Sequence, residues 1–150
     1  MSLSKIKIKN KKASFEYFLV ERIVAGIRLT GTEIKSIRLG KANITDAYCV
    51  FEEGELYIRN LHISEYSYGT YNNHLPKRER KLLLTARELK KWDTKVKEKG
   101  FTIIPTIMFI NDRGWAKIEI ALAKGKQHYD KRNTLKEKDA RREMDRMKKF

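Results

Sequence analysis

Apolar and polar positions alternate through much of the chain, which predicts half-buried strands. The clearest case is the segment 115–123, where Lys117 and Glu119 alternate with apolar neighbours, so that one face meets water. Further strands are expected where β-branched and aromatic residues gather, over residues 15–29, 42–51, 55–63 and 101–110.

Glycine and proline mark the irregular points of these strands. Ala25-Gly26 interrupts the segment 15–29 and predicts a bulge that bends a long strand. Pro105 lacks a backbone N–H, and so predicts an edge position or a bulge in the segment 101–110. Glu53-Gly54 is the turn expected between two of the strands.

Two helices interrupt the strand pattern. A short one is expected over 32–39, with Thr32 as its N-cap. A longer one should begin at a capping box formed by Thr85 and Glu88 and end before Gly100. Its apolar stripe consists of Ala86, Leu89, Trp92 and Val96.

The order of these elements predicts the fold class. Five or six strands with two helices and no parallel crossover favour a mainly β protein, a small antiparallel barrel with peripheral helices. Residues 1–12 read as a flexible basic arm, residues 13–123 as the barrel, and residues 124–150 as a basic C-terminal tail.

The net charge of the chain indicates that this barrel has a polyanionic partner. The chain of 150 residues has a formal net charge of +15, spread along its whole length. Residues 124–150 hold eleven Lys or Arg against five Asp or Glu, with too few apolar residues for a core. We expect this tail to be disordered when free and helical when docked, with RNA as the partner. A basic protein without one specific polyanion is the alternative, and membrane binding is disfavoured because no long basic helix carries a broad apolar face.

Catalytic and metal chemistry are not indicated. Cys49 is the single cysteine and reads as a small core residue, and the three histidines are widely separated. We therefore expect a binding protein with no cofactor and no metal. No signal peptide or membrane-spanning apolar run is present, so a cytoplasmic location is expected.

One basic cluster suggests where RNA would bind. Residues 77–81 hold four cations and follow a loop with three tyrosines. Cations pair with phosphates while Tyr and His rings stack on unpaired bases, although rim packing and a solvated charge run are the simpler alternatives. Glu33 is an unexpected carboxylate here. Its negative charge either interacts favourably with the N-terminus of its helix, or its oxygens accept hydrogen bonds from base or ribose donors.

Several blocks in a fixed order make the chain resemble a known family. The blocks are Asn10-Lys11-Lys12-Ala13, Ala25-Gly26-Ile27, Gly31-Thr32-Glu33-Ile34-Lys35-Ser36, Gly40-Lys41-Ala42-Asn43-Ile44, Arg80-Lys81-Leu82-Leu83-Leu84, Ala121-Leu122-Ala123-Lys124-Gly125-Lys126 and Asp130-Lys131-Arg132. Together they cover nearly the whole chain, and they resemble the SsrA-binding protein family, also called small protein B.

The resemblance implies a concrete function. The fold would be an OB-fold-like barrel, in accord with the strand count. The body would hold the tRNA-like domain of transfer-messenger RNA at the elbow formed by its D and T loops. The complex, with elongation factor Tu during delivery, would enter the A site of a stalled 70S ribosome. The tail would then lie along 16S rRNA in the decoding centre and the empty mRNA channel, and the protein would act as a monomer in trans-translation.

Residues carried over from the resemblance, together with the basic and aromatic positions above, give two candidate sets. The expected RNA-binding residues are Lys11, Lys12, Glu33, Lys35, Arg38, Asn73, His74, Arg78, Arg80, Lys81 and Leu83. The residues expected in the decoding centre and mRNA channel are Lys124, Gly125, Lys126, Tyr129, Asp130, Lys131, Arg132, Lys138, Arg141, Arg142 and Met147.

The chain also departs from the family pattern. Thr85 stands where many relatives have His or Asn, and Gln127 replaces a common lysine. The alternative function is a ribosomal protein or ribosome-assembly factor with a barrel body and an rRNA-binding tail. An RNA-modifying or RNA-cleaving enzyme ranks third.

Overall fold

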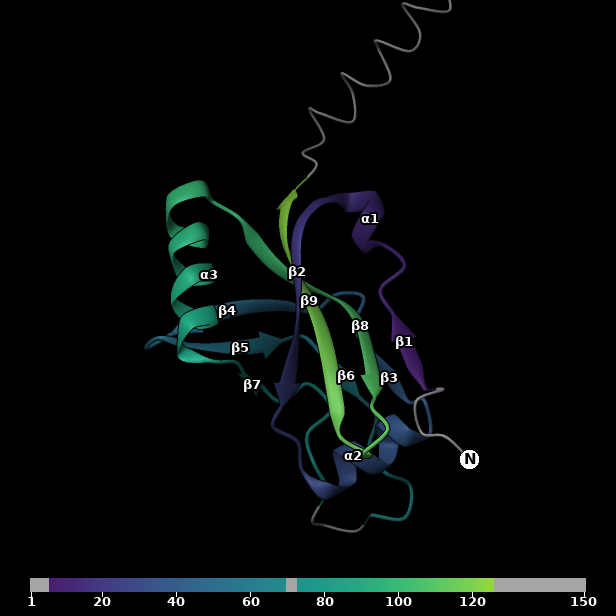
Figure 1. Cartoon of the computed structure of the whole chain (residues 1–150). Coiled ribbons are helices and arrows are strands. Elements are labelled where there is room, and N and C mark those ends of the chain that lie inside the picture. Colours follow the sequence, from purple (N-terminus) through teal and green to yellow (C-terminus); the bar gives the residue numbers. More distant parts are fainter. Residues whose placement is uncertain (1–5, 70–72, 126–150) are drawn as a thin grey trace, which may run out of the picture.

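The computed structural model describes residues 6–69 and 73–125 and shows a closed antiparallel barrel (Figure 1). Six strands form the ring, and each pairs with its neighbours in an antiparallel sense. In ring order they are β8 (Thr102–Ile110), β4 (Tyr48–Glu52), β5 (Glu55–Arg59), β7 (Arg80–Leu83), β2 (Tyr17–Ile27) and β9 (Ala116–Gly125), which pairs again with β8. The predicted mainly β barrel is therefore confirmed.

Three further strands lie outside this ring in the described residues. β1 (Lys7–Lys9) lies within the predicted N-terminal arm and pairs with β8 beside Met108. β3 (Ala42–Asn43) and β6 (His62–Ile63) pair with each other. The predicted strands 42–51 and 55–63 are thus each broken in two.

The breaks have local physical causes. Asn43 accepts a hydrogen bond from the backbone N–H of Thr45 at 2.8 Å and so closes a turn after β3. Asn60 has a φ of 59°, which ends β5 because a strand needs extended backbone. Ile44 and Leu61 in these breaks are fully buried, so the irregular segments still contribute to the core.

Within the described residues, three helices decorate the barrel: α1 (Ala13–Glu16), α2 (Gly31–Arg38) and α3 (Ala86–Lys99). The capping box at Thr85 and Glu88 is confirmed, and Gly100 ends α3 with a φ of 67°. The N-cap of α2 is Thr30 rather than the predicted Thr32, because Thr30 and not Thr32 lies three residues before Glu33. The single turn of α1 was not predicted.

One predicted bulge is confirmed and the other is misplaced. The pairing of β8 with β9 shifts register between Pro105 and Ile107, as the proline predicts. In β2 the shift falls between Leu19 and Glu21, not at Gly26. A Cβ at Gly26 would lie 3.2 Å from the Cβ of Leu83, so this glycine permits close approach of β7 instead.

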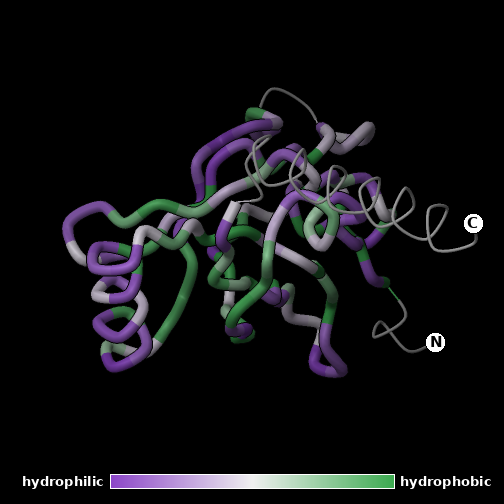
Figure 2. The backbone as a smooth tube through the Cα atoms, turned by 90° about the horizontal axis from the view of Figure 1, so that it is seen from above, coloured by the Kyte–Doolittle hydropathy of each residue, from purple (hydrophilic) through white to green (hydrophobic). Residues whose placement is uncertain are grey.

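The core fills the barrel and continues beneath α3. Trp92 is fully buried and packs with the isoleucines and leucines that alternate inward from the strands. Figure 2 shows these apolar stretches in the strands and a mainly hydrophilic α3. Cys49 is a buried core residue, as predicted, and burial raises the pKa of its thiol.

Candidate nucleic-acid interface

A buried ion-pair cluster anchors the end of the barrel that carries α2. The Glu33 carboxylate is fully buried. One of its oxygens, Oε1, accepts from the Thr30 backbone N–H at 2.8 Å and from Arg78 Nη2 at 2.5 Å. The other oxygen accepts from Nε of Arg80, whose guanidinium also donates to the carbonyl of Leu61 at 2.7 Å. The cluster therefore ties α2 to β7 and to the segment before β6.

These contacts set the ionisation of Glu33. Burial by itself raises the pKa of a carboxyl, but the hydrogen bonds from Arg78 and Thr30 and the charge of Arg80 outweigh it. The net effect lowers the pKa of Glu33, which stays ionised at neutral pH.

Stability should consequently depend on the charge of Glu33. Because its pKa is lowered on folding, its stabilisation is fully present above its ordinary value of 4.5 and is lost as pH falls through the folded-state pKa. We expect the free energy of unfolding, measured by urea titration, to fall more steeply below pH 4.5 in the wild type than in Glu33→Gln. Parallel pH curves for the two proteins would contradict this assignment. Glu21→Gln is the control, because the pKa of Glu21 is also lowered but its carboxyl is more exposed than that of Glu33.

Three of the predicted RNA-binding residues are buried in this structure. Glu33 and Arg80 are fully buried and His74 is 6% exposed, so their side chains do not present a surface to RNA. The His74 ring instead hydrogen-bonds the Thr32 hydroxyl and the Ile63 carbonyl oxygen, each at 2.9 Å. In this structure these residues position their neighbours, and a role for Glu33 as an acceptor for base or ribose donors stays a prediction.

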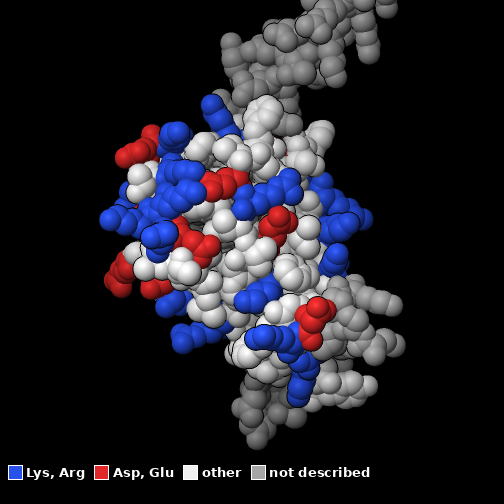
Figure 3. Space-filling view, viewed as in Figure 1, with Lys and Arg blue, Asp and Glu red and all other residues white. Residues whose placement is uncertain are grey.

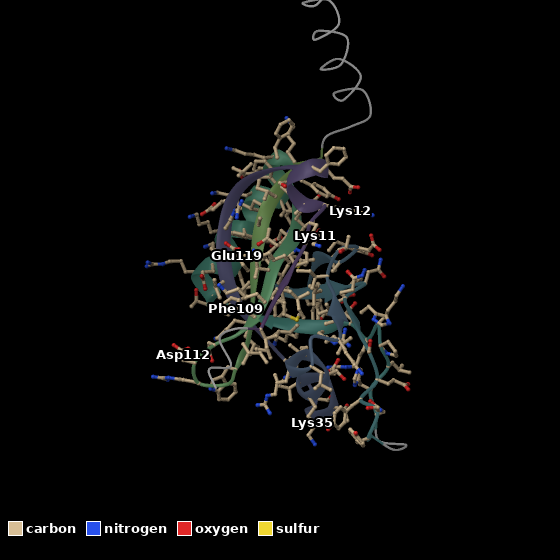
Figure 4. All side chains as sticks on the ribbon, turned by 90° about the vertical axis from the view of Figure 1, so that its right-hand side faces the viewer. Lys11, Lys12, Lys35, Phe109, Asp112 and Glu119 are labelled. Atoms are coloured by element: carbon tan, nitrogen blue, oxygen red, sulfur yellow. The ribbon has the colours of Figure 1, made fainter. Side chains whose placement is uncertain are left out.

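The neighbouring loop presents the groups that these buried residues hold in place. Asn73 is used within the loop, since its side-chain amide bonds the backbone N–H and carbonyl of Tyr66. Tyr66 stacks edge-on with Tyr68, which is 83% exposed. Lys35 lies 5.5 Å from the Tyr66 ring centroid. Together with Arg78, these rings and cations form an accessible surface around α2, of which Figure 4 labels Lys35.

A groove beside this surface was not predicted. It lies between the start of α2, the end of β7 and the turn between β8 and β9. Its walls carry the cations Arg28, Arg113 and Lys117 and no carboxylate. Trp115 is 67% exposed and Leu83 is 51% exposed in this groove. A polar turn followed by tryptophan, Asn111 to Trp115, is the sequence signal that could have indicated it.

Other predicted RNA-binding residues lie apart from the groove. Lys81 points toward Glu55, with 3.6 Å between their charged atoms. Lys11 and Lys12 are exposed beside α1, whereas Lys35 lies near the opposite end of the molecule (Figure 4). Arg38 is exposed near the end of α2. Figure 3 shows basic side chains scattered over the visible face, with acidic and uncharged side chains among them, in accord with the spread of charge expected from the sequence.

The predicted ribosomal set is described only at its start. Lys124 and Gly125 are the last residues of β9, where they pair with Phe18 and Tyr17. The barrel therefore extends two residues beyond the expected boundary at residue 123. Residues of this set that lie outside the described part are Lys126, Tyr129, Asp130, Lys131, Arg132, Lys138, Arg141, Arg142 and Met147.

Metal-binding clusters and membrane-spanning helices are both absent from the described residues. Within residues 6–69 and 73–125, no cluster of three or more His, Cys, Asp or Glu side chains could hold a metal ion. In the same residues no helix has the length and apolarity needed to cross a membrane.

The barrel, its exposed rings and its cation-lined groove define a nucleic-acid-binding protein. Comparison with known proteins makes the class specific. A family model described as SmpB protein matches residues 7–150. An SsrA-binding protein of Phocaeicola vulgatus is 60% identical, covering 98% of each chain. That of Parabacteroides distasonis is 58% identical over 94% of this chain and 92% of its own. The chain belongs to the SmpB family, which confirms the resemblance.

A solved structure supports the same conclusion. One chain of a structure described as "tmRNA-SmpB: a journey to the center of the bacterial ribosome" superimposes with a TM-score of 0.69. It is 44% identical, and the match covers 82% of this chain and 86% of that one. Membership of this family also confirms the expectation of an RNA-binding protein rather than an enzyme.

Proposed function

We propose that the α2 end of the barrel holds the tRNA-like domain of transfer-messenger RNA and that the groove beside it receives part of the RNA elbow. The chain is the transfer-messenger RNA partner in trans-translation, the process that rescues stalled ribosomes. The single observation that carries the assignment of the interface is the groove itself. Three cations and an exposed tryptophan line it, without any carboxylate to repel phosphate.

The chemistry of the groove suits a folded RNA. Arg28, Arg113 and Lys117 offer charge to phosphates, while Trp115 and Leu83 offer apolar surface to bases that are not stacked on neighbours. Such unpaired bases occur where RNA loops meet. Arg78 adds a half-exposed guanidinium whose direction is fixed by the buried Glu33. Recognition therefore depends on contour and charge rather than on reading a long base sequence.

The ribosomal half of the function concerns residues from Lys124 onward. In this proposal the bound complex enters the A site with elongation factor Tu, and the tail contacts 16S rRNA in the decoding centre and the empty mRNA channel. The location is cytoplasmic and the acting unit is a monomer. The tail composition, eleven cations against five acids from residue 124, supports an RNA partner for it.

The groove assignment is tested by substitution. Trp115→Ala should weaken binding of the purified tRNA-like domain about ten-fold, within the ~1–3 kcal/mol expected for loss of one stacked base. Arg113→Ala should reduce the slope of log affinity against log salt by about 1, as expected for one lost phosphate contact. Fluorescence anisotropy at several salt concentrations measures both effects.

Phe15→Ala is the matched control, because Phe15 is also 67% exposed but lies on α1. It should leave the affinity unchanged. Equal affinities for Trp115→Ala and wild type, together with an unchanged salt slope for Arg113→Ala, would refute the groove as the RNA site.

A further inference from the structure

A single row of side chains crosses the outside of five strands. In an antiparallel pair, residues directly opposite one another share a face of the sheet. Leu83 of β7 lies opposite Gly26 of β2, and Gly26 lies opposite Lys117 of β9. Lys117 in turn lies opposite Phe109 of β8, which lies opposite Lys7 of β1.

This row faces away from the core. Met108 and Ile118, which lie next to the row along β8 and β9, are fully buried in the barrel, and strand alternation places the row on the other face. Phe109 is partly exposed and belongs to neither hydrophobic core cluster. Figure 1 shows α3 on the other side of the barrel from β1. An aromatic ring thus lies between two lysines on an open sheet face.

The next row continues the same surface. Lys9 lies opposite Ile107, Ile107 opposite Glu119, and Glu119 opposite Val24. Glu119 is the only carboxylate in these two rows of described residues, and it accepts a hydrogen bond from the Thr106 hydroxyl at 2.9 Å. Figure 4 labels Phe109 and Glu119 on the face that also carries Lys11 and Lys12. The charge of this face is therefore predominantly positive.

The row is continuous with the proposed groove. Gly26, Leu83 and Lys117 belong to both. The Leu83 side chain lies over Gly26, with its Cβ 3.2 Å and its Cδ1 3.5 Å from the position a glycine Cβ would take. Apolar surface therefore extends from the groove to the cations of the sheet. Four strand spacings of ~4.8 Å give the row a length of about 19 Å, enough for a few nucleotides of single-stranded RNA.

We infer that this sheet face is a second RNA subsite, which takes an unpaired nucleotide of the same transfer-messenger RNA with its base on Phe109 and its phosphates at Lys7 and Lys117. The inference rests on the proposed function, because the neighbouring nucleotides of the same RNA would be bound in the groove. Every base has a flat face that can stack on an aromatic ring, and flanking cations pair with the adjoining phosphates. Tryptophan in the groove and phenylalanine on the sheet then act on different nucleotides.

The test compares binding of the isolated tRNA-like domain by the wild type and four full-length variants. Phe109→Leu keeps an apolar side chain but removes the ring, and should weaken binding about five- to ten-fold. Lys7→Ala should reduce the salt slope by about 1. Lys97→Ala, an exposed lysine of α3 paired with Asp93, is the charge-matched control and should change neither quantity. Trp115→Ala reports on the groove.

The possible outcomes separate the two proposals. Weakening by both Trp115→Ala and Phe109→Leu, with unchanged thermal unfolding, supports the subsite. Weakening by Trp115→Ala alone overturns the subsite and leaves the proposed function intact. If neither variant weakens binding, the groove assignment is refuted as well. If Phe109→Leu binds the RNA normally but loses ribosomal tagging, the face serves the ribosome, and the inference is again overturned.

Discussion

Replacing Glu33 with alanine should lower the free energy of unfolding by about 3–5 kcal/mol, the cost of leaving one member of a buried ion pair without its partner. Arg80 is fully buried. Within the described residues, Glu33 is the only carboxylate that forms an ion pair with it. The substitution also removes the capping box of α2. Urea denaturation at neutral pH measures the loss. Binding of transfer-messenger RNA should weaken as well, because Arg78 loses the group that fixes its direction.

The chain supplies a matched control for this effect. Glu88 closes the same kind of capping box on α3 through Thr85 but has no buried arginine partner. Glu88→Ala should therefore cost only about 1 kcal/mol. A similar cost for both substitutions would show that the buried pair adds nothing beyond the cap.

A double substitution isolates the buried charge. Glu33→Ala combined with Arg80→Met removes both members of the pair and should recover part of the stability lost in Glu33→Ala, because no unpaired charge then remains in the interior. RNA affinity should stay low in this protein, since Arg78 is still unanchored. Full recovery of RNA affinity would contradict the positioning role of Glu33.

Removing residues 131–150 should abolish ribosomal tagging while leaving binding of the tRNA-like domain close to that of the wild type. The proposed RNA-contacting groove and sheet face are formed by residues between 7 and 119, and the truncation removes none of them. The removed residues carry the tail charges assigned to ribosomal RNA. A reconstituted tagging reaction on a truncated message, run beside an RNA-binding titration, measures the two activities.

A tail of the same composition in scrambled order provides the control for charge. If the order of cations and apolar residues in the tail matters, the protein with the scrambled tail should not restore tagging. Tagging by the truncated protein, or a large loss of RNA affinity on truncation, would refute the division between barrel and tail.

The strands were predictable because alternation is a local signal. The alternation of Lys117 and Glu119 with buried apolar residues marks β9, and the capping box at Thr85 marks the start of α3. The cap of α2 was misassigned by two residues, although the spacing of Thr30 and Glu33 was visible in the sequence. The breaks after Asn43 and at Asn60 depend on turn geometry that the strand pattern does not reveal.

The functional site was only partly predictable, because its parts meet through the topology. Glu33 was identified as unusual, but its partner Arg80 lies 47 residues away and its burial was not foreseeable from neighbouring charges. The groove draws Arg28, Leu83 and Arg113 from three separate segments, which become neighbours only when the barrel closes. Basic residues that are continuous in sequence, such as those in 77–81, are a local signal, but their burial is not, and Arg80 is buried among them.

The most direct test of the central claim is a structure of this protein bound to the tRNA-like domain of transfer-messenger RNA. The account predicts RNA in the groove, with a base or ribose against Trp115 and a phosphate within hydrogen-bonding distance of Arg113. RNA bound instead to the outer face of α3, with the groove facing solvent, would contradict it.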